Sequence, residues 1–216
     1  MTPRFSIVHP SLGRPSQAAE TARMWLSTAK HGHDIDYIIS LNSTDAARGQ
    51  YLTHFSELPG ITIVTSDATN MVSASNVGAK QSKGENLILV SDDMFPMWHW
   101  DELVAAEFDP ELPTVLQVHD GIRNDIVTLP IMNRAAYLKL GYLYHPSYLS
   151  MFADNDLAET AKVHGMYKVS QLQFEHRHYT VGKAPIDDTY KRENSKVFYE
   201  YGQRTFEWRK RNGFPI

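Results

Sequence analysis

Strand-like and helix-like segments alternate through the first half of the chain, and this order constrains the fold more than any other feature. Apolar segments at residues 5–9, 37–41, 61–65 and 87–90 are each followed by a helical or turn segment. Strands that alternate with helices in this way are joined by right-handed crossovers into a mostly parallel sheet. The sequence therefore predicts an α/β, Rossmann-like fold with a mostly parallel central sheet flanked by helices.

The remaining segments continue this pattern less regularly. We expect early helices at residues 16–30, after the turn 42–45, at 72–82 and at 98–108, with capping residues or glycines near several of their ends. The second half predicts strands at residues 114–118, 125–129 and 167–174, and helices at 134–140 and 154–165. The tail 187–211 carries aromatic residues among charges, which is typical of a helix packed on the domain.

Composition limits the chemistry that is available to the chain. Its 216 residues carry a formal charge of −4 and include no cysteine, which excludes disulfides, thiolate nucleophiles and Cys-ligated zinc. No apolar stretch approaches the ~18 residues that a membrane-spanning helix needs. We expect a cytoplasmic protein with one domain over residues 1–216: a nucleotide-binding half to about residue 95, a substrate-shaping half over about 96–185, and a C-terminal helix over about 186–216.

Two adjacent carboxylates follow the apolar run at residues 87–90. Asp92 and Asp93 come where a strand buried on both faces would emerge into solvent, and α/β proteins bind ligands at such strand ends. The pair fits an ordinary polar turn as well as a site for Mg²⁺ or Mn²⁺, which take carboxylates and leave other positions to a substrate's phosphates. Both interpretations stay open at this point.

Further candidate ligands and bases lie in the second half. His176 and His178 follow a strand-like segment, and in an extended backbone they point the same way, so they either hold a metal together or are simply exposed. A mixed Asp and His shell favours Mn²⁺ over Ca²⁺. Asp154 and Asp156 begin an expected helix, where they cap free amide groups or where a carboxylate serves as a general base.

Three more positions have equally open roles. Asn70 and Asn76 belong to a helix start rich in small residues, including Gly78, which lets either a ligand or the neighbouring strand approach closely. Lys183 follows the histidine pair and either neutralises a phosphate or is solvated.

Taken in order, these segments resemble the GT-A fold glycosyltransferases of family 2, which are inverting nucleotide-sugar transferases, over roughly residues 4–185. The resemblance rests on the order of several short motifs and not on any one of them. The matching segments are Phe5-Ser6-Ile7-Val8-His9-Pro10 with Arg14-Pro15, Asn42-Ser43-Thr44-Asp45, Ser75-Asn76-Val77-Gly78, Lys83-Gly84-Glu85, Ser91-Asp92-Asp93, Ala153-Asp154, and His176-Arg177-His178 with Gly182-Lys183 and Asp187.

The resemblance implies a role for each of these segments. Asp93 falls on the acid of the family's Asp-x-Asp motif that binds the metal, His176 or His178 completes the metal shell, and Asp154 is the implied catalytic base. The implied cofactor is Mn²⁺ or Mg²⁺, and the implied donor is a nucleoside-diphosphate sugar, with a UDP-sugar favoured. The residues expected to bind this donor are His9, Pro10, Arg14, Asn42, Asn70, Asn76, Asp92 and Lys183.

Departures from the family pattern leave the donor base and the acceptor open. Ser91 stands in place of the first acid of the Asp-x-Asp motif, and Ala153 stands in place of a glutamate. Small relatives that modify hydroxymethylated bases in phage DNA make such a base one candidate acceptor, in which case the protein acts in the host cytoplasm. Two other functions fit the same residues: a metal-dependent hydrolase of a nucleotide sugar, and a catalytically silent nucleotide-binding module.

Overall fold

A computed structural model describes residues 2–58 and 60–216 of the chain. Seven strands form one sheet in the order β3-β2-β1-β4-β7-β6-β8. The strands β1 to β4 are parallel to one another, β7 is antiparallel to both of its neighbours, and β8 is parallel to β6. The sheet is therefore mixed and mostly parallel, as the alternation of segments predicts. Its strands are β1 (Phe5–Ser11), β2 (Ile35–Asn42), β3 (Ile61–Ser66), β4 (Asn86–Leu89), β6 (Val115–His119), β7 (Ile131–Asn133) and β8 (Tyr167–Gln173).

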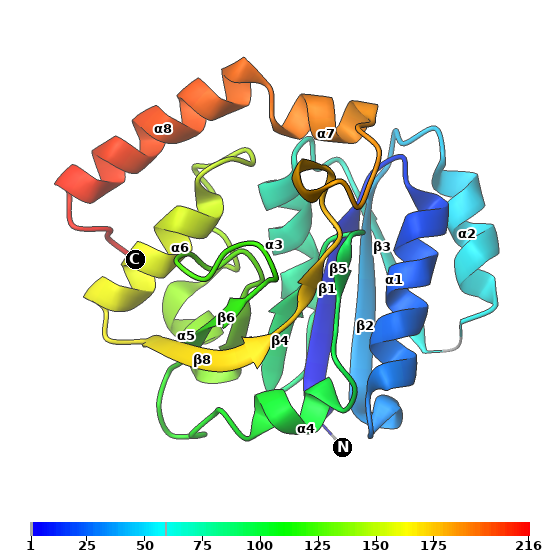
Figure 1. Ribbon diagram of the computed structural model, residues 1–216, viewed down its shortest axis with the longest axis horizontal. Coiled ribbons are helices and arrows are strands. Elements are labelled where there is room, and N and C mark those ends of the chain that lie inside the picture. Colours follow the sequence, from blue (N-terminus) through cyan, green and yellow to red (C-terminus); the bar gives the residue numbers. More distant parts are fainter. Residues whose placement is uncertain (1, 59) are drawn as a thin grey trace.

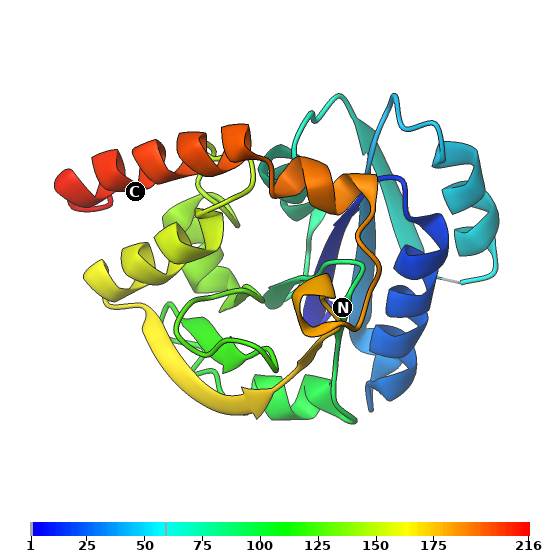
Figure 2. The same ribbon diagram turned by 45° about the horizontal axis from the view of Figure 1, so that its top comes forward.

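Helices cover both faces of this sheet (Figure 1). On one face α1 contacts α2, and on the other α3 lies over β1, β2 and β3 while α5 and α6 cover the strands that follow. Figure 2 shows α8 alongside α6, with α7 leading from the ends of the central strands into α8. The helices are α1 (Pro15–Thr28), α2 (Arg48–Ser56), α3 (Met71–Gln81), α4 (Trp100–Ala105), α5 (Arg134–Leu140), α6 (Ala153–Val163), α7 (Asp188–Glu193) and α8 (Lys196–Arg211).

Side chains of the central strands feed two separate cores, because successive residues of a strand point to opposite faces. Ile7 of β1 belongs to the core under α1, where Trp25 is fully buried. Its neighbour Val8 belongs to the second core, which includes Leu157 of α6. The central strands are therefore buried on both faces, which explains why the run at residues 87–90 is continuously apolar and does not alternate.

The start of α3 shows how a short sequence fixes local structure. Asn70 caps the helix by accepting a hydrogen bond from the backbone N–H of Ser73 (2.9 Å), and the Ser73 side chain pairs in return with the Asn70 backbone. A side chain at Gly78 would place its Cβ 2.7 Å from Val8 Cγ1. The glycine therefore lets the helix lie close to β1, which selects strand packing over ligand approach for this position.

The strand expected at residues 125–129 is wrong. Those residues belong to a loop, and the next strand is β7 at Ile131–Asn133. The carboxylate of Asp120 accepts backbone N–H groups of Ile122 (2.8 Å) and Arg123 (2.5 Å), which turns the chain at the start of this loop. Pro130 ends the loop and has no N–H to donate to a strand ladder. Side-chain capture of backbone groups therefore overrides the apolar pattern here.

The single helix expected over residues 187–211 is also wrong, because the tail forms two helices. The chain leaves the helical conformation at Ser195, whose hydroxyl accepts the N–H of Phe198 and caps α8. The helix expected at residues 98–108 is shorter and spans Trp100–Ala105. Within the described part of the chain, none of the helices combines the length and apolarity that crossing a membrane requires.

A short two-stranded ribbon lies outside the main sheet. Its strands β5 (Met94–Phe95) and β9 (Glu175–His176) pair antiparallel, with Met94 opposite His176. Because Met94 directly follows Asp93, this pairing brings the histidine segment beside the carboxylates at the end of β4. Residues that lie more than eighty positions apart in the sequence thus meet at one edge of the sheet.

Candidate active site

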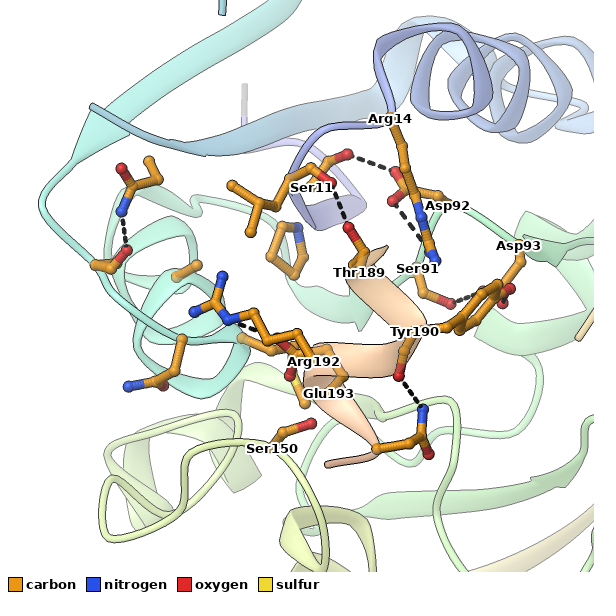
Figure 3. Close-up of a pocket in the computed structure, with 18 of the residues that line it drawn as sticks. Ser11, Arg14, Ser91, Asp92, Asp93, Ser150, Thr189, Tyr190, Arg192 and Glu193 are labelled. Carbon is orange, nitrogen blue, oxygen red and sulfur yellow. Dashed lines mark hydrogen bonds and ion pairs between the residues drawn. The ribbon is translucent and has the colours of Figure 1, made fainter. Parts of the chain in front are cut away.

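A cavity of about 280 Å³ lies at the carboxyl ends of the parallel strands, where α/β folds bind ligands (Figure 3). Its walls come from the ends of β1 and β2, the segment between β3 and α3, the end of β4, and α7. We refer to it as the donor-side cavity. The predicted site residues that line it are Pro10, Arg14, Asn42, Asn70, Asp92, Asp93, His176 and His178.

Asp93 receives a hydrogen bond at each of its two carboxylate oxygens. Its Oδ1 accepts the hydroxyl of Ser91 (2.5 Å), and its Oδ2 accepts the hydroxyl of Tyr190 (2.5 Å). Burial alone would raise the pKa of Asp93, but the hydrogen bond and the charge of His176, together with these two hydroxyls, hold that pKa well below its usual range. Asp93 is therefore ionised, as a metal ligand must be.

His176 lies between two carboxylates. Its Nε2 is 3.3 Å from Asp93 Oδ2, and its Nδ1 is 3.3 Å from Oδ2 of the buried Asp120. Burial lowers the pKa of His176, but the two carboxylates outweigh this effect and raise it to about 9. The His176 ring is therefore protonated in the metal-free protein and connects Asp93 to Asp120. The two carboxylates fix the orientation of the ring.

A metal ion fits the residues at this point. Asp93, His176 and His178 each offer one ligand atom, and these atoms lie within 4.8 Å of one another. The Nδ1 atom of His178 pairs with the hydroxyl of Thr180 (2.8 Å), which leaves its Nε2 as the ring atom for a metal. Burial and the neighbouring charge of His176 lower the pKa of His178, which keeps this ring neutral. One carboxylate and two imidazoles form a donor set that suits Mn²⁺.

Asp92 has a different role from its neighbour in this structure. Its Oδ1 accepts hydrogen bonds from the hydroxyl of Ser11 (2.6 Å) and pairs with Nε2 of the buried His9 (3.0 Å), and its backbone oxygen accepts the hydroxyl of Thr21 (2.7 Å). His9 is fully buried and also contacts the hydroxyl of Tyr37 (2.8 Å). This buried network anchors the end of β4 to β1 and α1, so Asp92 and His9 hold the cavity floor in place.

Arg14 stands at the rim of the donor-side cavity. Its guanidinium donates two hydrogen bonds to Asp187 (2.7 and 2.6 Å), lies 3.8 Å from Asp92 Oδ2, and stacks 4.0 Å from the ring centre of Tyr190. Burial lowers its pKa, but the hydrogen bond to Asp187 and the charges of Asp187 and Asp92 raise it overall. Arg14 thus remains a cation and ties the segment before α7 to the first strand.

The helix α7 closes the outer side of this cavity, as Figure 3 shows. The hydroxyl of Thr189 donates to the backbone oxygen of Leu12 (3.0 Å), and Arg192 donates to the backbone oxygen of Thr69. Tyr190 points inward to Asp93, with its phenol only 8% exposed. The tail of the chain therefore contributes a wall to a cavity whose other lining residues come mostly from the first ninety-odd residues, together with Ser150, His176 and His178.

A second cavity of about 460 Å³ adjoins the first and contains Asp154. We refer to it as the acceptor-side cavity. Both cavities are lined by Ser91, Ser150 and His176, so they meet beside the candidate metal ligands. Asp154 lies in the first turn of α6, and burial raises its pKa. A carboxylate with a raised pKa in a cavity is a suitable general base.

Three predicted donor residues do not line the donor-side cavity, as far as the described chain goes. His9 lies beneath it, as described above. Asn76 binds the backbone of the loop before α6, with its amide donating to the oxygen of Tyr144 (2.7 Å) and accepting from the N–H of Leu143 (2.9 Å). Lys183 pairs with the exposed Glu175 (2.9 Å). The roles of these three residues in donor binding stay predictions. Each residue also has a structural contact that accounts for its position without a donor.

Two residues that contact the candidate metal ligands have no site role in the sequence patterns. Asp120 contacts His176, and Tyr190 contacts Asp93. Asp156, which shares a helix start with Asp154, is fully buried and forms an ion pair with Arg209 of α8 (2.6 Å). Asp154 and Asp156 are two residues apart, and this spacing places them on different faces of α6. The spacing is the one sequence signal that separates the cavity-lining Asp154 from the buried Asp156.

Comparisons with known proteins identify the fold. Scans against models of protein families and against curated proteins return no match. Among solved structures, the mannosyltransferase PcManGT from Pyrobaculum calidifontis in complex with GDP-Man and Mn²⁺ superposes with a TM-score of 0.65 and 11% identity, over 82% of this chain and 57% of that chain. TarS of S. aureus, residues 1–349, superposes with a TM-score of 0.64 and 14% identity, over 98% of this chain and 74% of that chain.

The same S. aureus protein in complex with UDP-GlcNAc superposes with a TM-score of 0.60 and 15% identity, over 98% of this chain and 75% of that chain. The fold is therefore that of the GT-A glycosyltransferases. This chain spans just over half of the length of PcManGT.

Proposed function

We propose that this protein is a metal-dependent, inverting glycosyltransferase that moves a sugar from a nucleoside-diphosphate sugar to an acceptor hydroxyl. The observation that carries the proposal is the meeting of two cavities at His176, with the ionised Asp93 on the donor side and the protonatable Asp154 on the acceptor side. The fold supports it, because solved structures with this fold are in complex with GDP-Man and Mn²⁺ or with UDP-GlcNAc. A UDP-sugar is the favoured donor.

On the donor side, Asp93, His176 and His178 would hold Mn²⁺ or Mg²⁺, which when bound supplies positive charge to the diphosphate as it leaves. Ser91 and Tyr190 keep Asp93 oriented through hydrogen bonds to its two oxygens. Asp120 keeps the His176 ring in one orientation by accepting from its Nδ1. Arg14, at the rim, adds a cation near the diphosphate side.

On the acceptor side, Asp154 takes the proton of the acceptor hydroxyl. The acceptor oxygen then forms a bond to the anomeric carbon, the bond from that carbon to the diphosphate oxygen breaks, and the nucleoside diphosphate leaves with the electron pair. Because attack comes from the side opposite to the leaving group, the anomeric configuration inverts. The raised pKa of Asp154 suits a base that works near neutral pH.

The test is turnover of UDP-glucose and UDP-N-acetylglucosamine with Mn²⁺. Turnover is measured as release of the nucleoside diphosphate, and the sugar product is identified by mass spectrometry. Asp93→Asn should lose metal-dependent nucleotide binding together with turnover. Asp154→Asn should keep nucleotide binding and lose transfer by about 10²- to 10⁴-fold. Asp188→Asn is the matched control, because the Asp188 side chain is 99% exposed. Unchanged turnover of Asp154→Asn with release of free sugar would favour a hydrolase instead.

Two further expectations remain predictions. The first is the single domain over residues 1–216, with a nucleotide-binding half to about residue 95, a substrate-shaping half over about 96–185 and a C-terminal segment over about 186–216. The second is a hydroxymethylated base of phage DNA as the acceptor, together with action in the cytoplasm.

A further inference from the structure

The acceptor-side cavity has the walls of a site for an apolar molecule. Ile126, Leu129 and Tyr144 line it and are at most 7% exposed. Phe152 and Tyr199 form an aromatic pair at its edge, with ring centres 5.1 Å apart in an edge-to-face arrangement. Its volume of about 460 Å³ falls within the range of pockets that enclose a small organic ligand.

The charges at this cavity disfavour a polyanionic acceptor. Arg123 is the lining arginine, and its guanidinium already donates two hydrogen bonds to Asp125 (2.9 and 2.6 Å). Asp154 contributes negative charge beside it. On α8, next to Tyr199, Lys196 pairs with Glu200 (3.6 Å). A polymer of phosphodiesters gains its affinity from unpaired Lys and Arg side chains, and the cations named here have acidic partners.

Phe152 is held in a strained conformation at this wall. Its φ angle is +72°, which is uncommon for a residue with a bulky side chain. The side chain packs against Tyr199 and Phe206, and Gly202 lets α8 approach so closely that a Cβ there would lie 2.3 Å from the backbone oxygen of Met151. The strain is thus maintained by α8, and the ring lies at the cavity two residues before Asp154 in the chain.

We infer that the acceptor is an uncharged small molecule in which a hydroxyl or hydroxymethyl group is attached to an aromatic or alicyclic ring system, and that this ring system binds between the Phe152–Tyr199 pair and the Ile126–Leu129 wall. The inference rests on the proposed glycosyl transfer and names the chemical class of its acceptor. The ring body buries apolar surface, and its hydroxyl faces Asp154, the base that accepts the proton. The products are the glycoside of that alcohol and the free nucleoside diphosphate.

The experiment offers the protein one nucleotide sugar, Mn²⁺ and a panel of acceptors: benzyl alcohol, naphthylmethanol and cyclohexylmethanol, against maltose, a glycerol phosphate polymer and duplex DNA containing hydroxymethylcytosine. Thermal shift by the nucleoside diphosphate with Mn²⁺ is measured first, so that failure of the donor site is recognised separately. Glycosides of the ring alcohols, detected by mass spectrometry, are expected. If the nucleoside diphosphate binds but no ring alcohol is glycosylated, the inference is overturned. This holds whether or not maltose, the polymer or the DNA accepts the sugar.

Two variants of α8 make this test specific to the wall. Tyr199→Ala removes a lining ring, and the KM for the ring alcohol should rise about tenfold while the thermal shift by the nucleoside diphosphate stays. Tyr201→Ala is the matched control, because Tyr201 is 39% exposed on the same helix and does not line either described cavity. Equal KM values for the two variants would contradict the assignment of the wall.

Discussion

The affinity of the site for Mn²⁺ should depend steeply on pH, because the metal competes with a proton on His176. The two carboxylates that flank this ring raise its pKa to about 9. At pH 7 the ring is about two pH units below that pKa, so about 1% of it is neutral and able to bind a metal. The apparent dissociation constant at pH 7 should therefore be about a hundredfold higher than the value for the neutral ring.

This dependence can be measured between pH 6.5 and 8.5 by titration calorimetry or by the EPR signal of free Mn²⁺. The dissociation constant should fall about tenfold for each pH unit, and about one proton should be released per metal ion, which calorimetry in two buffers of different ionisation enthalpy counts. A dissociation constant that is flat over this range, with no proton release, would show that Mn²⁺ does not compete with a proton on His176. His176→Gln is the control that should bind the metal poorly at every pH.

The same proton should stabilise the metal-free fold. A histidine whose pKa is raised on folding contributes stability that is fully present below the unfolded pKa of about 6.5 and is lost as the pH rises through about 9. A shift of this size corresponds to about 3 kcal/mol. The melting temperature of the metal-free protein should therefore fall between pH 6.5 and 9, and a constant or rising value would contradict the bridge between the two carboxylates.

Three further changes have expected outcomes that separate site effects from fold effects. Asp120→Asn should weaken Mn²⁺ binding about 10- to 100-fold at pH 9, where a proton competes little for His176, because the ring loses the partner that orients it; an unchanged dissociation constant at that pH would remove Asp120 from the site. Arg209→Ala should cost about 3–5 kcal/mol in urea unfolding, because it leaves its fully buried carboxylate partner without a counter-charge, and a loss under 1 kcal/mol would contradict the burial. Gly78→Ala should destabilise by about 1–3 kcal/mol, whereas Gly49→Ala, where a Cβ meets nothing within 4 Å, should not; equal effects would count against the close contact with β1.

The regular part of the fold could be predicted from the sequence because its signals are local. The strands β1, β2, β3 and β4 are short apolar runs, and they appear where the runs predict them. The strand β7 could not be predicted in place, since it has three residues and its apolar pattern is shared with the preceding loop. What decides between them is side-chain chemistry that an apolar pattern does not record. The Asp120 carboxylate accepts the backbone N–H groups of the residues two and three positions further on, and Pro130 has no N–H for a ladder bond.

The residues of the candidate site also fall into two groups: those that a local motif predicts, and those that only the folded structure brings together. Asp93 and His176 were named from their motifs, and the pairing of Met94 with His176 is what brings them together in space. Neither Asp120 nor Tyr190 had a signal of its own, because each acts through a partner that is remote in the sequence. The roles assigned to Asp93, Asp154, His176 and His178 stay predictions until variants are measured.

We propose that the donor-side cavity binds a nucleoside diphosphate through a metal held by Asp93. Titration calorimetry of UDP into the protein, with and without Mn²⁺, tests it most directly when Asp93→Asn is run beside the unchanged chain. We predict binding by the unchanged chain only when Mn²⁺ is present, and its loss in Asp93→Asn. Binding that needs no metal, or that survives in Asp93→Asn with the same affinity, would contradict the account.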